Sequence, residues 1–315
     1  MFNHFLFSVN TVMPLFLLIA LGFFLKRSEF LPEKFFSAGN KMVFYILLPV
    51  TIFNSIFSAD LSELASVGFA AFAIGATAFS FVIVWAVSVF FIKDKQVLGP
   101  FVQGAFRSNM VFVGIPLMRN LAGEIGVARF ALIIALVMPL YNIFSILVLS
   151  VCADTDEKLK FITVVKTILK NPLIIAIIIS ITFSLLNIQL PQAATRTLSD
   201  LSNMATPMAL ICLGGGIIFL GFDKKFKYAI IASVLKIVVV PLAFTTAAYA
   251  LGFRGIDLAA FMVLGGTSSA VAGYTMVIQM GGDSYTAGNI ILFSTLLSSL
   301  TLTLFIYVMV VLGLL

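Results

Sequence analysis

Two cations stand inside stretches of the chain that are otherwise apolar. They are Arg107 and Lys236, and no Asp or Glu accompanies either one within its stretch. A cation at the centre of a membrane helix costs about 2.5–3.5 kcal/mol on insertion scales, so each needs a partner or a function. Arg107 lies two residues before Asn109 and either attracts an anion or extends to the cytoplasmic surface. We interpret Lys236, five residues before Pro241, as a structural intramembrane cation; contact with a substrate is the alternative.

The lack of intramembrane carboxylates limits the chemistry. Carriers coupled to sodium or protons usually place Asp or Glu at the coupling site. Coupling to H+ or Na+ here would use backbone carbonyls, hydroxyls or a boundary acid such as Asp257. No nucleophile–base pair, phosphate loop or metal-ligand spacing is present, and the sequence offers one His and two Cys. We expect no cofactor, no metal site and no enzyme activity.

The elements that carry these residues are predicted to be transmembrane helices. Of 315 residues, 61% are hydrophobic and 10% charged, whereas soluble domains carry roughly 25% charged residues. Apolar runs of about 18 residues or more are long enough to span a bilayer as helices. Ten such runs are predicted, at 1–25, 42–59, 64–92, 99–118, 130–153, 171–195, 201–222, 226–252, 258–282 and 284–315. The fold class is therefore an all-α polytopic membrane protein with about ten transmembrane helices.

The loop cations predict the orientation. Positive loops stay in the cytoplasm. Those after spans one, three, five and seven hold Lys26, Arg27, Lys34, Lys41, Lys93, Lys95, Lys158, Lys160, Lys166, Lys170, Lys224, Lys225 and Lys227. The other side holds Arg119, Arg129, Arg196 and Arg254. We expect a multi-pass protein of the cell membrane (inner or plasma) with both termini outside, and the net charge of +6 then requires no nucleic-acid partner.

The sequence contains an internal repeat. Three pairs recur at offsets of 158 or 159 residues: Pro14 with Pro172, Pro49 with Pro207, and Gly123-Glu124 with Gly282-Asp283. Five spans per repeat is an odd number, so the halves enter the membrane in opposite directions, as in secondary transporters. The predicted organisation is a first repeat at 1–152 (helices 1–5), a cytoplasmic linker at 153–170 and a second repeat at 171–315 (helices 6–10).

Spans four and nine are expected to be broken. Gly114 and Pro116 lie close together in span four, and Gly265, Gly266 and Gly273 flank two serines in span nine. Interruptions at matching positions of two halves mark transporter binding sites. The amide groups at a half-helix start suit a carboxylate. The alternative is a proline kink with small residues for helix packing.

Several segments resemble the auxin efflux carrier family in its compact bacterial form. They are VMPLFLLIALGFFLKR, NKMVFYILLPVTIFNSIF, FRSNMVFVGIPLMRNLAGE, KNPLIIAIIIS, ATPMALICLGGGI and FSTLLSSLTLTLF, and together they cover essentially the whole chain. The family more distantly resembles bile-acid:sodium symporters. The resemblance implies a 5+5 inverted repeat with crossed, broken helices 4 and 9. It also implies a scaffold of helices 1, 2, 6 and 7, a transport domain of helices 3–5 and 8–10, and a homodimer formed through the scaffold.

The resemblance also implies a substrate site at the two crossings. Its residues would be Arg107, Asn109, Gly114, Ile115, Pro116, Asn142, Thr267, Ser268 and Ser269, with Thr51 and Asn54 from the scaffold. Ser269 stands where the family usually has proline, and interhelical hydrogen bonding is the alternative role for Asn142 and Asn54. The predicted function is a secondary carrier that moves a small organic anion, such as an auxin-like acid or a malate-like dicarboxylate, by an elevator mechanism. A sodium-coupled bile-acid-type symporter and a channel or receptor are the alternatives.

Overall fold

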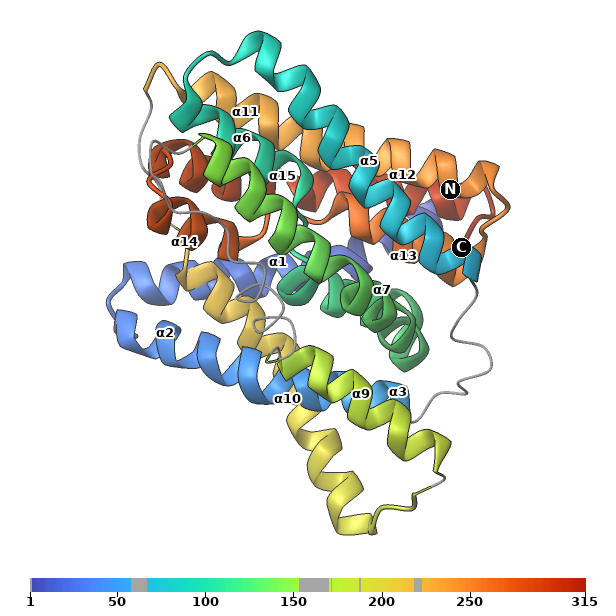
Figure 1. The fold of residues 1–315 in the computed structure, drawn as a ribbon. Coiled ribbons are helices and arrows are strands. Elements are labelled where there is room, and N and C mark those ends of the chain that lie inside the picture. Colours follow the sequence, from blue (N-terminus) through green and yellow to red (C-terminus); the bar gives the residue numbers. More distant parts are fainter. Residues whose placement is uncertain (1, 58–66, 153–169, 171, 187, 218–222) are drawn as a thin grey trace.

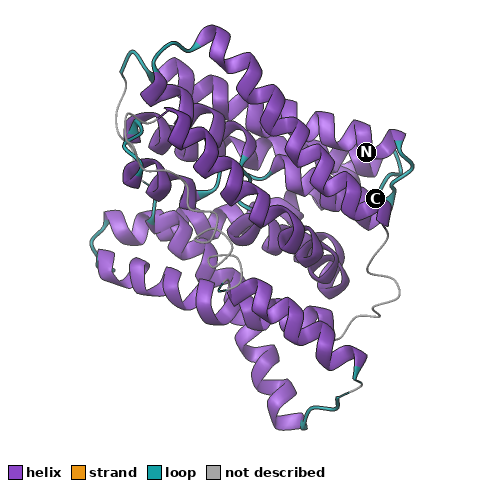
Figure 2. Cartoon of the chain, in the orientation of Figure 1, coloured by secondary structure: helices purple, strands orange, loops and turns teal. Residues whose placement is uncertain are grey.

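A computed structural model describes residues 2–57, 67–152, 170, 172–186, 188–217 and 223–315. Within these ranges the chain forms helices joined by loops (Figure 2). The predicted linker at 153–170 lies outside the described residues, apart from Lys170. The first half contains α1 (Phe2–Arg27), α2 (Glu33–Met42), η1 (Val43–Leu47), α3 (Leu48–Phe57), α5 (Val67–Phe91), α6 (Lys95–Phe106), η2 (Met110–Gly114) and α7 (Ile115–Cys152). The second contains α9 (Pro172–Leu185), α10 (Gln192–Gly215), α11 (Phe226–Val234), η3 (Leu235–Val239), α12 (Val240–Ala250), α13 (Gly255–Gly266), α14 (Val271–Gln279) and α15 (Ser284–Val311).

Six helical runs in the described chain are long and apolar enough to cross a membrane. They are Asn3–Arg27, Glu33–Asn54, Val67–Phe91, Met110–Cys152, Phe226–Ala250 and Ser284–Val311. The helices α9 and α13 are apolar but shorter. The protein is thus a multi-pass helical membrane protein, and the count of ten spans in an inverted repeat stays a prediction.

The long helix α7 is two segments joined at a kink. Ala122 and Gly123 leave helical geometry, and Gly123 has φ 60° and ψ −148°. Only glycine adopts such a conformation without strain. The kink lies between the two runs predicted at 99–118 and 130–153, so the chain turns where the sequence predicts that spans four and five separate.

In the part of the chain that the structure describes, each of the three π-helical turns comes just before a proline. The turns η1, η2 and η3 end two residues before Pro49, Pro116 and Pro241. A proline in a helix lacks an N–H donor and its ring clashes with the carbonyl four residues earlier. A wide turn at that carbonyl relieves the clash, and single π turns occur often at functional sites. The chain therefore passes these prolines with a local widening instead of a break.

Two layers of helices can be followed in Figure 1. In its lower part, α2, α3, α9 and α10 lie together, with α3 packed on α9 and α10. The upper part contains α5, α6 and α11 to α15, in which α12 packs on α13 and α11 on α15. The helix α1 packs along α10 and also contacts α7 and α15.

Glycines let α1 and α10 approach closely. A Cβ on Gly214 would lie 1.9 Å from Ile19 O, and one on Gly22 would lie 2.0 Å from Ile211 O. Small residues at helix contacts allow this approach in membranes, where van der Waals packing replaces the hydrophobic driving force. The α1–α10 pair is therefore fixed backbone to backbone.

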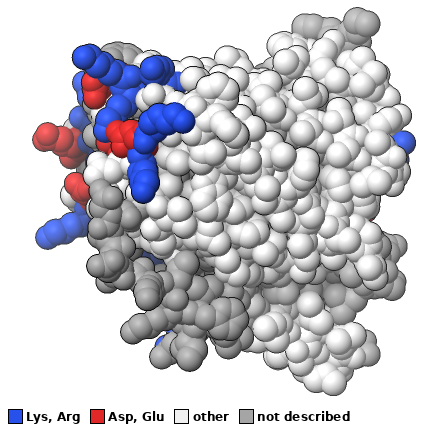
Figure 3. Space-filling view, turned by 45° about the horizontal axis from the view of Figure 1, so that its top comes forward, with Lys and Arg blue, Asp and Glu red and all other residues white. Residues whose placement is uncertain are grey.

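Charged side chains gather at one end of the molecule. On the face in Figure 3 they cluster at the left, and the chain ends lie to the right in Figure 1. At this end the Asp283 carboxylate accepts a bond from Thr286 N (2.9 Å) and lies 3.1 Å from Lys225 Nζ. Burial raises the pKa of Asp283, but the hydrogen bonds from Thr286 and Lys225 outweigh it, and the net pKa is below its ordinary value. The same contact raises the pKa of Lys225.

Candidate functional site

Two non-helical segments, residues 107–109 and 267–270, pair through their backbones at a place that we call the crossing. The first separates α6 from η2, and the second separates α13 from α14. An antiparallel bridge between Ser108 and Ser269 holds the pair, and its two hydrogen bonds run from Asn109 N to Ser268 O (2.8 Å) and from Ala270 N to Arg107 O (3.3 Å). Non-helical backbone at membrane depth survives only where protein or a water-filled cavity satisfies its polar groups. Each break thus supplies hydrogen-bond partners for the other.

Side chains of α7 and α15 and a backbone carbonyl of α13 hold the crossing in place. Ser108 Oγ donates to Leu264 O, and Tyr141 OH donates to Ser108 Oγ at 3.1 Å. Ser269 N donates to Ser294 Oγ at 3.0 Å. The crossing is therefore tied to α7, α13 and α15.

Lys236 lies at the end of the broken helix α13. Its side chain is fully buried, and Nζ donates to the carbonyl oxygen of Gly265, one residue before the helix ends at Gly266. The last carbonyls of a helix lack intrahelical partners and carry partial negative charge, so a cation there is stabilised. This is the geometry that a structural intramembrane cation requires.

Two helix N-termini meet at the crossing. One is the start of η2 at Met110, where Asn109 Oδ1 accepts a bond from Phe112 N at 3.3 Å. The other is the start of α14 at Val271. The first amides of a helix carry partial positive charge and lack intrahelical acceptors. Together they form a region that favours an anion.

The break in span four lies earlier than the sequence predicts. Gly114 and Pro116 were expected to break the helix, but both are inside the helical run that starts at Met110. The π turn accommodates Pro116, and a Cβ on Gly114 would lie 2.5 Å from the Phe130 ring. Gly114, Ile115 and Pro116 are buried. The amides at the half-helix start therefore belong to residues near Met110, which corrects the expected position.

A cavity of about 740 Å³ opens beside the crossing. Its walls come from η1, the crossing, η2, α7, α9 and α14, with Lys170 before α9, and they comprise Phe44, Tyr45, Arg107, Ser108, Asn109, Met110, Val111, Phe112, Met138, Tyr141, Asn142, Lys170, Pro172, Ala270, Val271, Ala272 and Met276. Among these described residues the charged ones are Arg107 and Lys170, and none is acidic. The charged groups of the described wall are thus cations, and much of the remaining wall is apolar.

Neutral groups hold the Arg107 guanidinium. Nη1 donates to Ser145 Oγ at 3.1 Å and contacts Met276 Sδ at 3.0 Å, while Nη2 donates to Asn142 Oδ1 at 3.0 Å. The side chain is 8% exposed, and no acidic group pairs with it among the described residues. The guanidinium thus points to α7 and α14, and its charge is not neutralised by the described part of the chain.

Three polar side-chain atoms at the crossing have no hydrogen-bond partner in the described structure. They are Asn109 Nδ2, Thr267 Oγ1 and Ser268 Oγ. Asn109 lines the cavity, whereas Thr267 and Ser268 are fully buried behind it. A buried donor without a partner costs about 1–3 kcal/mol, so Asn109 Nδ2 is a donor that a ligand would satisfy.

Of the predicted site residues, the structure brings Arg107, Asn109 and Asn142 to the cavity wall. Thr51 and Asn54 do not line it. Thr51 Oγ1 bonds to Leu47 O (2.9 Å) and approaches Ser202 O at 3.5 Å, so it belongs to the contact between α3 and α10. Ser269 is buried in the bridge to Ser108.

Several cavity residues were missed from the sequence. Tyr141 lines the cavity, and Ser145, which accepts a hydrogen bond from Arg107, stands four residues later on the same face of α7; this helical spacing was the available pattern. Met276 and Tyr45 are an apolar and an aromatic residue within apolar spans. Residues of the same types also face lipid, so the residue type alone does not indicate a cavity. Lys170 was counted only as a loop cation.

The boundary acid Asp257 is committed to an ion pair. Its carboxylate receives two hydrogen bonds from Arg129, at 2.6 and 2.7 Å, and the guanidinium lies 4.3 Å from the Phe69 ring centroid. A two-bond Arg–carboxylate pair is among the stronger charged contacts. Asp257 thus joins α13 to α7 and lies away from the described cavity wall.

A multi-pass fold with a polar crossing and a cavity beside it is the architecture of a membrane transporter, and comparison with known proteins agrees. The family model described as "Membrane transport protein" matches residues 7–306, so the chain belongs to this family, that of the auxin efflux carriers. A protein of Methanothermobacter thermautotrophicus named "uncharacterized transporter" is 25% identical over 303 residues, covering 95% of this chain and 98% of that one. Another so named, from Methanocaldococcus jannaschii, is 24% identical over 275 residues, covering 84% and 86%. The protein is a transporter and not an enzyme.

Proposed function

We propose that this transporter carries a small organic anion with at least one carboxylate, bound in the cavity beside the helix crossing. The observation that carries the proposal is Asn109 Nδ2, a buried donor without a described partner, between two helix N-termini and close in sequence to Arg107. All of these groups attract negative charge. The described cavity wall offers no carboxylate to hold a cation instead.

The apolar part of the wall suggests which anions fit. Phe44, Tyr45 and Met138 line the cavity, and their apolar surfaces suit an aromatic or aliphatic body attached to a carboxylate. Lys170 supplies a second cation that a dicarboxylate would use. We therefore propose an auxin-like acid and a malate-like dicarboxylate as the two classes to compare.

We propose that the substrate crosses the membrane by alternating access of the elevator type. The cavity wall combines Phe44, Tyr45 and Pro172, from the proposed scaffold of helices 1, 2, 6 and 7, with the crossing, from the proposed transport domain of helices 3–5 and 8–10. Movement of the crossing past a static scaffold wall would carry the bound anion to the other side. The repeats at 1–152 and 171–315 and a homodimer through the scaffold are part of this proposal.

We further propose that Lys236 takes the place of a coupling cation. Its buried ammonium holds Gly265 O at the end of α13, where unpaired carbonyls would otherwise suit a bound ion. Transport would then be independent of sodium. A sodium-coupled carrier of the bile-acid type is the second candidate, and sodium-dependent uptake would favour it.

Counterflow in proteoliposomes tests the site. The panel is labelled indole-3-acetate with short mono- and dicarboxylates, and the decisive variant is Asn109→Asp. This change keeps the oxygen that caps Phe112 N but replaces the Nδ2 donor with a second acceptor. Losing a hydrogen bond to a charged group costs about 1.5–3 kcal/mol, which predicts a roughly 10- to 100-fold weaker substrate affinity.

Asn203→Ala, an exposed change on α10, is the matched control and should leave affinity unchanged. Size-exclusion profiles and melting temperatures of all variants establish that they fold. Asn109→Ala, which adds no charge, is the second site variant. Wild-type affinity in both folded Asn109 variants would remove this site from consideration, and large single-channel currents would replace the carrier with a channel.

A further inference from the structure

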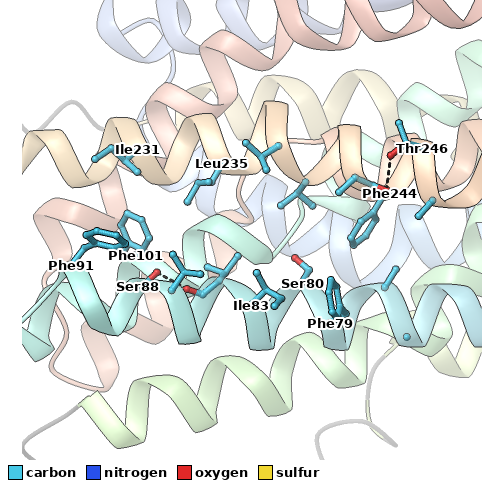
Figure 4. A pocket seen from close by; sticks show the side chains of 18 of the residues that line it. Phe79, Ser80, Ile83, Ser88, Phe91, Phe101, Ile231, Leu235, Phe244 and Thr246 are labelled. Atoms are coloured by element: carbon cyan, nitrogen blue, oxygen red, sulfur yellow. Dashed lines mark hydrogen bonds between the residues drawn. The ribbon is translucent and has the colours of Figure 1, made fainter.

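A long apolar groove lies on the outside of the molecule, between α5 and the segment from α11 to α12. It encloses about 840 Å³. Figure 4 shows side chains of the two segments facing one another, with Phe79 and Ile83 on α5 opposite Leu235 and Phe244. The groove and the cavity at the crossing share no lining residue. It is therefore a separate feature from the proposed substrate site.

The groove is open along the membrane-spanning part of the chain. Phe79 is 68% exposed and Phe91 is 75% exposed, and both α5 and the segment Phe226–Ala250 are long and apolar enough to span a bilayer. A Cβ on Gly75, which lines the groove, would have no atom within 4 Å. The glycine thus leaves space that the described chain does not fill.

One end of the groove meets lysines. Ile92 and Tyr228 line that end. Lys93 directly follows Ile92 in the chain, Lys227 directly precedes Tyr228, and both lysines are exposed. The Lys227 ammonium lies 5.0 Å from the centroid of the Tyr228 ring, which holds it beside the groove. Lys93 Nζ lies 3.5 Å from Val89 O near the end of α5.

The acids at this end have other partners. Asp94 accepts a bond from Gln96 N and lies 3.8 Å from Lys225, which also pairs with Asp283. Asp223 Oδ1 accepts a bond from Lys224 N. Figure 3 shows basic and acidic side chains together at the left of the view, with one separate basic group at the right edge. The two lysines therefore remain positioned to meet an anionic group at the end of the groove.

We propose that this groove binds an anionic phospholipid, with an acyl chain along the groove and the phosphate at the end flanked by Lys93 and Lys227. The shape and apolar lining suit a hydrocarbon chain, and the charge at one end only suits a molecule with one charged end. Each lysine near a membrane surface favours anionic lipid roughly fivefold. A second copy of the chain would fill the apolar part but would not account for the lysines.

Native mass spectrometry tests the proposal. The protein is first reconstituted in equal amounts of phosphatidylglycerol and phosphatidylcholine and is then extracted. Wild type should retain phosphatidylglycerol through extraction. Gly75→Leu places a side chain in the groove and should lower retention at least tenfold. Ala71→Leu is the matched control, since Ala71 is exposed one turn earlier on α5 and does not line the groove.

The headgroup is tested separately with Lys93→Gln combined with Lys227→Gln. This double variant should still retain phospholipid but lose its preference for phosphatidylglycerol by roughly tenfold or more. Equal retention by Gly75→Leu and wild type would overturn the proposal, as would wild-type binding of both lipids alike. A dimer that Gly75→Leu dissociates, with no lipid bound to wild type, would identify a second copy as the occupant instead. The readout is lipid binding, so the result is independent of the proposed transport.

Discussion

The Arg107 guanidinium gives the cavity its charge. A buried cation that is held only by neutral groups keeps its full charge in a medium where charge is expensive. Ser145, Met276 and Asn142 orient Arg107 without neutralising it. A bound carboxylate would supply the missing counter-charge, which is the physical reason for proposing an anion.

Lys236 supports a prediction at the residue scale. Lys236→Met keeps the length and apolar stem of the side chain and removes the ammonium from Gly265 O. We expect transport to fall at least tenfold and to be partly restored by sodium or another monovalent cation, because the carbonyls at the end of α13 then lack their cation. Counterflow of the preferred substrate in sodium chloride and in choline chloride measures both effects.

Lys224→Met, which removes an exposed lysine at the charged end, should change neither rate nor ion dependence. Two results contradict the structural-cation role: sodium-dependent transport by wild type, or a Lys236→Met protein that transports normally in choline. Melting temperatures distinguish a loss of transport from a loss of folding.

At the scale of elements, close helix contacts and π turns shape the helices of the proposed scaffold. The turn η1 carries the chain past Pro49, so α2, η1 and α3 continue in one direction as a single run. Gly22 and Gly214 allow α1 and α10 to meet at backbone distance. These features explain how helices that contain prolines can continue through them and still pack closely on one another.

The α1–α10 contact gives the second prediction. In Gly214→Ala the new methyl would overlap Ile19 O, which is backbone and cannot move aside like a flexible side chain. We expect a loss of several kcal/mol in stability, as for overpacked or separated helices, and a clearly lower melting temperature in detergent.

Gly68→Ala on α5 is the control for this substitution. Its new Cβ would meet only the tip of the Phe253 ring, at 4.0 Å, so the gain in helix propensity should leave stability equal or slightly higher. An unchanged melting temperature in Gly214→Ala would mean that α1 and α10 are not held at this distance.

At the scale of the whole molecule, polar contacts join α7 to the helices of the proposed scaffold. Arg119 donates to Ser202 O (3.1 Å) and Ser202 Oγ (2.9 Å) on α10, and it lies 3.0 Å from Glu124. Asn120 Nδ2 donates to Thr11 O on α1 at 2.9 Å. In an elevator these contacts would exist in one state and break in the other.

Crosslinking tests this interface. Cysteines at Arg119 and Ser202, joined by a short bifunctional thiol reagent, should stop counterflow while leaving substrate binding intact, because transport requires the two helices to separate. The native Cys152 and Cys212 are replaced by alanine, so that only the introduced pair can react. Each single-cysteine variant treated with the same reagent is the control, and normal counterflow in the crosslinked protein would contradict relative movement at this contact.

Some of the candidate site followed from the sequence and some did not. Asn109, Arg107 and Asn142 were predicted from spacing and resemblance, and they line the cavity. Gly114 and Pro116 were expected at the break because proline disfavours helix. The π turn just before Pro116 instead widens the helix, so that the helix continues through the proline. Thr51 was expected at the cavity, but its hydroxyl bonds to Leu47 O within its own run and approaches Ser202 O on α10.

The sequence by itself determined that the chain crosses a membrane and that most of its cations lie outside the long apolar runs, because the apolar content of each run is a local property. It also indicated the polar residues that interrupt those runs. Tertiary structure decided where the backbone leaves the helix, because the Arg107–Asn109 break is stabilised by pairing with residues about 160 positions away. It also decided which side chains share a cavity and that Lys236 reaches Gly265 O, since these contacts join helices whose order in space no local pattern encodes.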